Sequence, residues 1–272
     1  LRALGLLLLL PLAFPPQQLP EQGQAEVWQL DVGQGLAMLV LTREHALLYD
    51  AGPRYGDFDL GERVVVPSLR SLGVSKLDMM LLSHADTDHA GGALAVRQSL
   101  PVARVLSGEA AALPPQLAAK PCVDGASWRW DGVRFTTWRW AQAAEGNQSS
   151  CLLRVEAAGE TLLLTGDIDA AAERALLAGG RELRADWLQI PHHGSRSSSS
   201  ATFLEAVSPS AAVLSRGSNN PFGHPHPQVM ASYQARGVRV YDNVATGALR
   251  IRLGAREAPY GWRERRVFWR EK

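Results

Sequence analysis

The sequence predicts an α+β protein in which two β-sheets pack back to back and helices cover their outer faces. Strand-like segments follow one another closely near the start of the chain, and helix-like and strand-like segments alternate in its second half. Of the 272 residues, 46% are hydrophobic and 20% are charged, so the chain can bury a large core and is not disordered as a whole.

The first half is expected to contain five strands and two helices. Gly33 and Gly35 mark a tight turn between the first two strands. The apolar run at 79–82 favours a strand covered on both faces, and Pro101 ends the second helix. We expect strands at 25–32, 36–42, 46–52, 76–83 and 102–108, and helices at 60–74 and 89–100.

The second half is expected to begin with two hairpins, the first of which turns at Asp131 and Gly132. Helix-like and strand-like segments alternate after them, and the chain ends in strands. The expected hairpins are 127–140 and 149–167, the helices are 169–179, 199–208 and 226–236, and the strands are 186–191, 211–216, 238–243, 247–253 and 261–270.

The chain begins at Leu1 with an apolar run that stops at Pro15 and Pro16. This run is shorter than the roughly 20 residues that a full transmembrane helix needs. It is therefore either the apolar region of a secretory signal or the last part of a membrane span that began upstream. We expect residues 1–25 to be the end of a membrane segment plus a linker, and residues 26–272 to form the folded domain.

Basic residues are concentrated near the end of the chain. Residues 236–272 contain ten basic and four acidic residues, although the whole chain has a formal net charge of only +1. Such a patch can bind a polyanion, and Trp262 and Trp269 among the arginines could stack on bases. The alternative is a solvated pair of arginine-rich strands, and the sequence leaves both interpretations open.

The two cysteines, Cys122 and Cys151, lack the spacing of a zinc site, and neither lies beside a histidine in the sequence. They are either two buried thiols or, in an oxidising compartment, one disulfide bond. Their positions alone do not decide between these alternatives.

Six of the seven histidines fall in three pairs. Each pair lies just past an apolar, strand-like run or in the loop beyond one, which places the histidines near the ends of strands. Such grouping indicates a metal or catalytic site rather than scattered surface residues. The pairs are His84 and His89, His192 and His193, and His224 and His226.

The first pair belongs to the densest group of potential metal ligands in the chain. His84, Asp86, Asp88 and His89 lie within six residues. A loop with these side chains can wrap around two cations about 3.5–4 Å apart, the separation typical of two-metal sites. The alternative is a polar loop in which one of the aspartates caps a helix. Four such residues together favour the metal site.

Two further aspartates end apolar runs beside a glycine, Asp50 and Asp167. A strand that delivers a carboxylate into such a loop can point it into a site. Turn capping is the alternative for each, and it is the stronger reading for Asp50. Asp167 could bridge two ions, with further histidines completing the ligand shell.

Six motifs follow one another along the chain, namely DVGQGLAMLV, LLYDAGP, HADTDHAGG, LLLTGD, LQIPHHGS and GHPHP. Together they resemble the C-terminal metallo-β-lactamase-like domain of the ComEC DNA-uptake family. The resemblance covers residues 26–253 and implies an αββα four-layer sandwich. The sequence departs from the family in two places. Asp86 replaces the second histidine of the His-x-His-x-Asp-His signature, and no histidine lies between His89 and Asp167, so one metal position is short of a ligand.

The resemblance implies one or two divalent ions held by six residues. Asp88, His192 and His224 are the catalytic candidates. His192 would bind substrate or serve as the alternate ligand, and His224 would contact the scissile phosphate or the leaving oxygen. Because the ligand set is rich in carboxylates, we expect Mn²⁺ to be favoured over Zn²⁺. The implied ligands are His84, Asp86, Asp88, His89, Asp167 and His193.

The function implied by the resemblance is that of a metal-dependent phosphodiesterase, a nuclease that degrades the non-transforming DNA strand during natural DNA uptake. The ions would activate water for attack on phosphorus and neutralise developing charge. The implied partners are single-stranded DNA, the membrane channel portion of the same longer chain, and other DNA-uptake proteins. The implied location is the inner membrane, with this domain on the periplasmic or extracytoplasmic side, where a disulfide between Cys122 and Cys151 would persist.

Two other classes of function stay open at this point. The same motifs occur in hydrolases of other phosphodiesters, such as phosphocholine esters, and of lactones. The domain could also bind DNA or gate the channel without catalysis, which the missing ligand histidine slightly favours.

Overall fold

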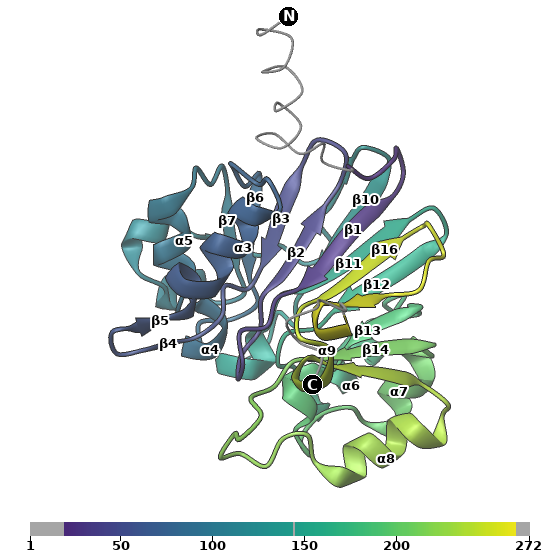
Figure 1. The fold of residues 1–272 in the computed structure, drawn as a ribbon. Coiled ribbons are helices and arrows are strands. Elements are labelled where there is room, and N and C mark those ends of the chain that lie inside the picture. Colours follow the sequence, from purple (N-terminus) through teal and green to yellow (C-terminus); the bar gives the residue numbers. More distant parts are fainter. Residues whose placement is uncertain (1–18, 144, 265–272) are drawn as a thin grey trace, which may run out of the picture.

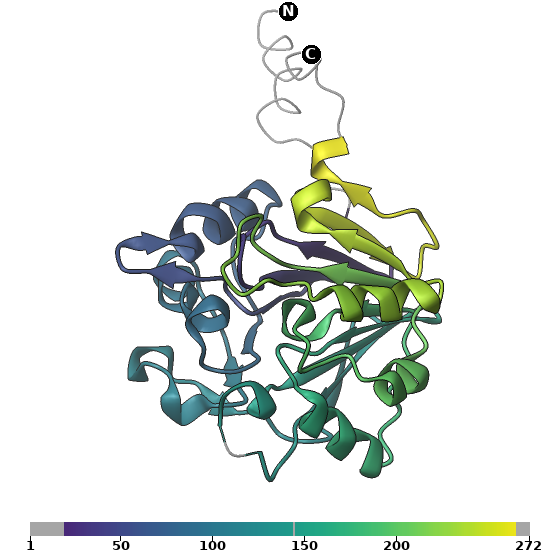
Figure 2. The same ribbon diagram turned by 90° about the horizontal axis from the view of Figure 1, so that it is seen from below.

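Two β-sheets lie face to face in the middle of the molecule, and helices cover the outer face of each (Figure 1). The structure is a computed structural model and describes residues 19–143 and 145–264. Seen from below, the blue helices of the first half and the green helices of the second half lie at the periphery (Figure 2). The predicted αββα four-layer sandwich is confirmed.

The first sheet begins as an antiparallel meander of β1, β2 and β3 and continues with parallel strands from β3 to β8. The late strand β16 pairs with β1, with Ala25 opposite Leu253. The strand order in the described part of the chain is β17-β16-β1-β2-β3-β6-β7-β8. The bounds are β1 (Ala25–Gln29), β2 (Met38–Leu41), β3 (Ala46–Tyr49), β6 (Met79–Leu82), β7 (Val105–Ser107), β8 (Lys120–Pro121), β16 (Leu249–Leu253) and β17 (Tyr260–Gly261).

The second sheet contains both predicted hairpins. Strands β9 to β12 are antiparallel, whereas β12 to β15 are parallel because helices return the chain between them. Its order is β15-β14-β13-β12-β11-β10-β9. The bounds are β9 (Ser127–Trp130), β10 (Val133–Trp138), β11 (Leu152–Ala157), β12 (Glu160–Leu164), β13 (Trp187–Gln189), β14 (Ala211–Leu214) and β15 (Arg239–Asp242), and a separate small hairpin consists of β4 (Arg54–Tyr55) and β5 (Phe58–Asp59).

The helices divide between the two outer layers. Helices α3 and α5 pack on the first sheet, and α6, α7 and α8 pack on the second. The bounds are η1, a π-helix (Gly61–Val65), α3 (Val66–Ser71), α4 (Thr87–Ala90), α5 (Ala93–Ser99), α6 (Ala170–Ala178), α7 (Ala201–Val207), α8 (Pro227–Ala235) and α9 (Asn243–Thr246), with short 3₁₀ helices at Ala110–Ala112, Pro115–Leu117, Gly146–Ser149, Pro191–Gly194 and Trp262–Glu264.

Alternate residues of the central strands face different layers, as the pleat of a strand requires. Leu47 and Tyr49 of β3 lie in the core between the sheets, whereas Leu48 faces the helices of the first outer layer. In the second sheet, Leu162 points into the central core and Leu163 into the second outer layer. Because both faces of these strands are buried, they appear in the sequence as continuous apolar runs.

The predicted helix at 89–100 is divided into α4 and α5. The division follows from Gly91 and Gly92, where the chain passes very close to neighbouring backbone. A Cβ atom on Gly92 would lie 2.3 Å from the carbonyl oxygen of Ala51. The two glycines therefore allow α4, and the loop before it that carries His84 and Asp86, to pack directly against the loop after β3.

Two predictions concern the ends of the chain. The prediction of a strand at 261–270 is wrong for Trp262–Glu264, which form a short 3₁₀ helix after β17. Residues 265–270 lie outside the described residues. The predicted membrane segment within residues 1–25 falls mostly outside them as well. In the part that the structure describes, no helix has the length and apolar character needed to cross a membrane.

A disulfide bond joins Cys122, just after β8, to Cys151, just before β11. This confirms one of the two alternatives for the cysteines. Tyr49 donates a hydrogen bond of 2.9 Å to the carbonyl oxygen of Cys151, and Cys151 donates its N–H to Ser83 at 2.8 Å. The disulfide bond therefore connects the edge strand β8 of the first sheet to the residue before β11, which lies beside the end of β6.

Replacing both cysteines by serine is expected to lower the free energy of unfolding by about 3 to 4 kcal/mol. The bond closes a loop of 29 residues, and the unfolded chain without it gains the entropy of that open loop. Urea denaturation of the Cys122→Ser, Cys151→Ser variant beside the oxidised wild type measures the difference. Two free thiols per chain in unreduced, denatured wild-type protein would contradict the bond itself.

Candidate metal centre

The predicted site residues come from loops at one edge of both sheets. Parallel strands place their carboxyl ends at the same edge, where ligand sites of α/β sheets form. The loops after β3 and β6 reach this edge from the first sheet, and those after β12, β13 and β14 reach it from the second. Helix α4, which carries Asp88 and His89, lies at this edge, below the sheets in Figure 1.

Four of the predicted ligands converge at this edge. Asp88, His89, Asp167 and His193 each offer one ligand atom, and these atoms lie within 4.8 Å of one another. His193 Nε2 is 3.2 Å from Asp88 Oδ2 and 3.4 Å from Asp167 Oδ2. His89 Nε2 is 3.1 Å from Asp167 Oδ1. The two halves of the chain thus contribute equally to a candidate divalent metal site.

Hydrogen bonds to the far side of each imidazole fix which nitrogen faces the cluster. His89 Nδ1 lies 2.7 Å from Asp50 Oδ2, and His193 Nδ1 donates to the carbonyl oxygen of Ser215 at 2.8 Å. Both Nε2 atoms are thereby turned toward the carboxylates. Partners of this kind are the usual means by which proteins orient metal-binding histidines.

Asp50 is therefore more than a turn residue. It is fully buried, and its carboxylate also accepts the N–H of Ser83 at 2.6 Å and the hydroxyl of Ser83 at 2.8 Å. Its φ of 58° is rare for a residue other than glycine, although aspartate tolerates it better than most. Such a conformation persists where the surroundings over-determine it, as they do here.

His84 and Asp86 lie beside the four converging ligands. The His84 ring is 4.4 Å from the ring of His89, and its Nε2 is 3.4 Å from Asp86 Oδ2. Asp86 occupies the position before α4, yet its side chain makes no capping hydrogen bond, which removes the capping explanation for it. Ser150, in the segment between His89 and Asp167 that contains no histidine, lies 3.5 Å from His84 Nδ1 and accepts the N–H of Asp167 at 3.2 Å.

The residues fit a divalent cation on the evidence of their unpaired atoms. Among the described residues, His84 Nε2 and Asp167 Oδ1 are buried and make no hydrogen bond of suitable geometry, although Asp86 Oδ2 lies 3.4 Å from the first and His89 Nε2 lies 3.1 Å from the second. Burying polar atoms in this way is costly unless a cation or a better-placed partner satisfies them. Both atoms belong to predicted ligands, and imidazole nitrogen and carboxylate oxygen are donors that Zn²⁺ and Mn²⁺ accept.

The charges of the cluster are strongly coupled. Burial would raise the pKa of Asp88, but the hydrogen bond from His193 and the charge of His89 outweigh it and lower that pKa to about 2. Burial would likewise raise the pKa of Asp167, yet the same two imidazoles hold it well below its usual value. Burial alone would lower the pKa of both histidines, but the carboxylates of Asp167, Asp50 and Asp88 raise it. The protonation of the two imidazoles is therefore coupled to the charges of these carboxylates.

Metal binding is expected to release protons, because a ligating imidazole must be neutral. The raised pKa values of His89 and His193 mean that these imidazoles hold protons to higher pH than free imidazoles do, and binding must displace them. Affinity should therefore fall as the pH is lowered. Titrating metal-stripped protein in a weakly buffered solution counts the released protons. A metal affinity that does not change between about pH 5 and pH 8 would contradict this charge state.

The remaining catalytic candidates form the rim of the site. His192 Nε2 is 3.9 Å from Asp167 Oδ2, and the His224 ring is 5.6 Å from the His192 ring. The side-chain amide of Asn147 lies 3.3 Å from His192 Nε2. Within the described residues, His224 Nδ1 and Asn147 Oδ1 are buried with no hydrogen-bond partner. The rim therefore presents free polar atoms beside the candidate metal centre.

The site also depends on residues without a clear signal in the sequence. Glu109 accepts the N–H of Ala85 at 2.9 Å and that of Gly146 at 2.6 Å, which joins the first ligand loop to the segment carrying Asn147. For Gly35 the sequence allowed either a plain hairpin turn or a close approach of the backbone to the site. A Cβ atom there would lie 2.3 Å from the carbonyl oxygen of Asp88, so this glycine is needed for close approach.

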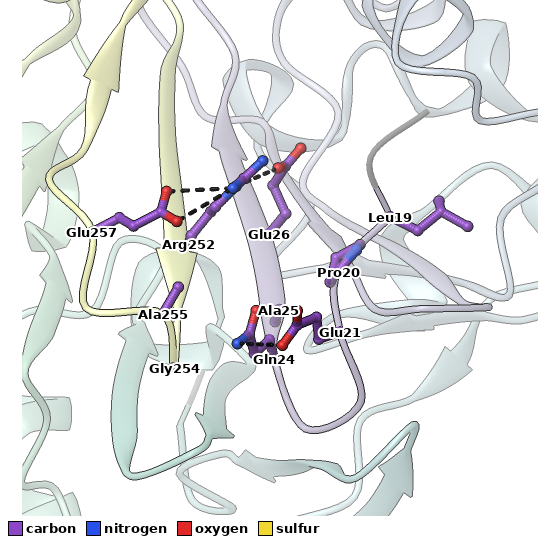
Figure 3. A pocket seen from close by; sticks show the side chains of 10 residues that line it. All are labelled: Leu19, Pro20, Glu21, Gln24, Ala25, Glu26, Arg252, Gly254, Ala255 and Glu257. Carbon is purple, nitrogen blue, oxygen red and sulfur yellow. Dashed lines mark hydrogen bonds and ion pairs between the residues drawn. The ribbon is translucent and has the colours of Figure 1, made fainter. Parts of the chain in front are cut away.

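A separate pocket of about 400 Å³ lies at the opposite edge of the first sheet, where β1 begins and β16 ends (Figure 3). Its charged groups pair with one another, since Arg252 contacts both Glu26 and Glu257 at 3.3 Å. Arg263, also in the basic C-terminal segment, pairs with Asp31 at 2.7 Å. These two arginines of the predicted basic patch therefore have acidic partners within the fold.

Comparison with known proteins finds a matching family model and several relatives similar in sequence. A model of the Metallo-beta-lactamase superfamily matches residues 30–217. Competence protein ComA of Neisseria gonorrhoeae is 38% identical over 247 residues, which cover 89% of this chain and 34% of that protein. Recombination protein 2 of Haemophilus influenzae is 32% identical over 230 residues, 82% of this chain and 29% of that one. The chain thus spans about a third of the length of these relatives.

Among solved structures, the metallo-beta-lactamase fold protein YhfI from Bacillus subtilis superposes with a TM-score of 0.52. The match covers 80% of this chain and 96% of that protein at 11% sequence identity. At this level of identity the match supports the fold alone.

Proposed function

The chain belongs to the metallo-beta-lactamase superfamily, as a hydrolase domain of the kind found in competence proteins, and from this premise we propose that it is a metal-dependent phosphodiesterase that cleaves single-stranded DNA. The observation that carries the proposal is the convergence of Asp88, His89, Asp167 and His193 within 4.8 Å, beside a rim of unpaired polar atoms. A set of candidate metal ligands with hydrogen-bonding groups next to it suits a charged, oxygen-rich substrate.

Each group at the site has a role in this proposal. A divalent ion held by Asp88, His89, Asp167 and His193 would supply Lewis-acid activation of water and charge neutralisation at phosphate. His84 and Asp86 offer a second position. Asp50 keeps His89 in the orientation that a ligand needs.

The rim residues would hold the phosphate. Burial lowers the pKa of His192, and burial together with the charges of His192 and His193 lowers the pKa of His224. Both rim imidazoles are therefore neutral at pH 7, and each can donate one N–H to a phosphate oxygen. The side chain of Asn147, which lies against His192, can contribute a further hydrogen bond.

We propose the same biological setting for the domain. Its substrate would be the non-transforming strand during DNA uptake, and its partners would be the membrane channel portion of a longer chain and other DNA-uptake proteins. It would work on the periplasmic side of the inner membrane, where the Cys122–Cys151 bond would be maintained. The names of the relatives, which refer to competence and recombination, support this setting.

The experiment that tests the activity uses purified, metal-stripped protein and three substrates. Labelled single-stranded DNA, bis(p-nitrophenyl) phosphate and a lactone are each incubated with and without Mn²⁺. We expect metal-dependent cleavage of the DNA and loss of cleavage with EDTA. Hydrolysis of the lactone alone would overturn the proposal. Binding of DNA without cleavage in the presence of Mn²⁺ would instead favour a non-catalytic role. The lack of a histidine between His89 and Asp167 makes this outcome worth testing.

A further inference from the structure

We propose that Phe222 is a stacking platform for a nucleobase next to the scissile phosphate, an inference that rests on the proposed function. Phe222 is 65% exposed, the largest exposed fraction among the large hydrophobic residues that the structure describes. A single exposed apolar residue needs no explanation by itself. The surroundings of Phe222 distinguish it from such a residue.

The ring of Phe222 continues a row of rings that leads to the candidate metal centre. Its centroid is 5.8 Å from that of His224, and the two planes are inclined by only 27°. The ring of His224 is in turn 5.6 Å from that of His192, which lies 3.9 Å from Asp167. One face of Phe222 is thus supported by a rim histidine, while most of the ring remains open to solvent.

The loop that carries Phe222 is held at both ends and across its middle. Gly217 donates its N–H to Gln34 Oε1 at 3.0 Å, and His226 donates its N–H to Gly194 at 2.8 Å. Asn220 spans the loop, because its amide donates to the carbonyl oxygen of His224 at 2.7 Å and accepts the N–H of His224 at 3.0 Å. The exposed ring is therefore presented on a braced loop, which reduces the entropy lost when a ligand stacks on it.

These features match what single-stranded nucleic acid requires. If the rim imidazoles hold one phosphate, a base of an adjacent nucleotide can be placed on an aromatic face a few ångströms further along. Stacking on an aromatic ring is favourable for every base and is sequence-tolerant. A second aromatic side chain, Tyr55, is 53% exposed, and its hydroxyl donates to Gln34, the residue that anchors the Phe222 loop. The mouth of the site is thus suited to bases as well as to phosphate.

The test compares variants of Phe222 on two probes. One probe is a labelled oligothymidylate, and the other is an oligonucleotide of the same length built from abasic nucleotides. Phe222→Ala and Phe222→Leu are expected to raise KM for the oligothymidylate about tenfold with little change in kcat. Phe222→Tyr, which retains an aromatic face, should remain close to the wild type. None of the three Phe222 variants should alter KM for the abasic probe. Leu19→Ala removes another exposed apolar side chain at the opposite edge of the first sheet and is the matched control.

Two results would overturn the inference. KM for the oligothymidylate could be unchanged in Phe222→Ala, or it could rise equally for the abasic probe, which would show that the ring acts on the loop and not on a base. Binding of both probes to metal-stripped protein, followed by fluorescence anisotropy, separates this inference from the activity. Phe222-dependent binding of the oligothymidylate, together with no cleavage after Mn²⁺ is restored, would refute the nuclease proposal and leave the stacking platform standing.

Discussion

Replacing Asp88 by asparagine is expected to reduce DNA hydrolysis by more than a hundredfold while the protein remains folded. Loss of a partner that merely orients a ligand typically costs about 10- to 100-fold, and loss of a ligand itself should cost more. Asp88 lies 3.2 Å from His193 Nε2 and is 27% exposed, so it faces the site and not the core. Asparagine keeps its size and removes the negative charge, which leaves the packing of α4 intact.

Glu182→Gln is the matched control for this change. It also converts a carboxylate to an amide, but Glu182 is 77% exposed and forms an ion pair with Arg154 away from the site. Initial rates, bound metal per chain and thermal unfolding are measured for both variants. We expect Asp88→Asn to lose metal and activity together and to unfold near the wild-type temperature. Wild-type turnover in Asp88→Asn would refute the metal site, whichever substrate is used.

Those parts of the fold that depend on local pattern could be predicted from the sequence. The apolar runs of β3 and β6 indicate strands buried on both faces, and the structure places their alternate residues in two different cores. The clustering of His84 with Asp88, and of His192 with His193, predicted site residues in both halves of the chain. Parallel strands then bring these loops to one edge, so the convergence follows from the topology.

Contacts between distant parts of the chain could not be predicted in this way. Asp50 resembles a turn residue until β3 and β6 are paired, because only then does its carboxylate reach His89. Glu109 and Asn147 lie in irregular segments whose residue types fit many surface loops. The hairpin of β4 and β5 is too short for its periodicity to be recognised, and the small 3₁₀ helix at Trp262–Glu264 depends on packing against α9.

The identity of the metal is the last property that the ligand set allows us to predict. Asp86 supplies a hard, anionic oxygen where the His-x-His-x-Asp-His signature has its second imidazole, and the segment between His89 and Asp167 contains no further histidine. The six candidate ligands are thus three carboxylates and three imidazoles. Sites rich in nitrogen and sulfur suit Zn²⁺, whereas oxygen-rich sites with positions left for water suit Mn²⁺. We therefore expect faster DNA hydrolysis with Mn²⁺ than with Zn²⁺.

Asp86→His tests this reasoning, because it restores the nitrogen donor without touching the four converging ligands. Asp86 is 55% exposed, so an imidazole can be accommodated there. Metal-stripped wild type and variant are titrated with each ion while DNA hydrolysis is followed. In the wild type, added Zn²⁺ should inhibit the Mn²⁺-supported reaction by occupying the site more tightly, and in Asp86→His the preference should move toward Zn²⁺. If Zn²⁺ alone restored full turnover in the wild type and Mn²⁺ had no effect, the hard-ligand argument would be wrong, although the site itself would stand.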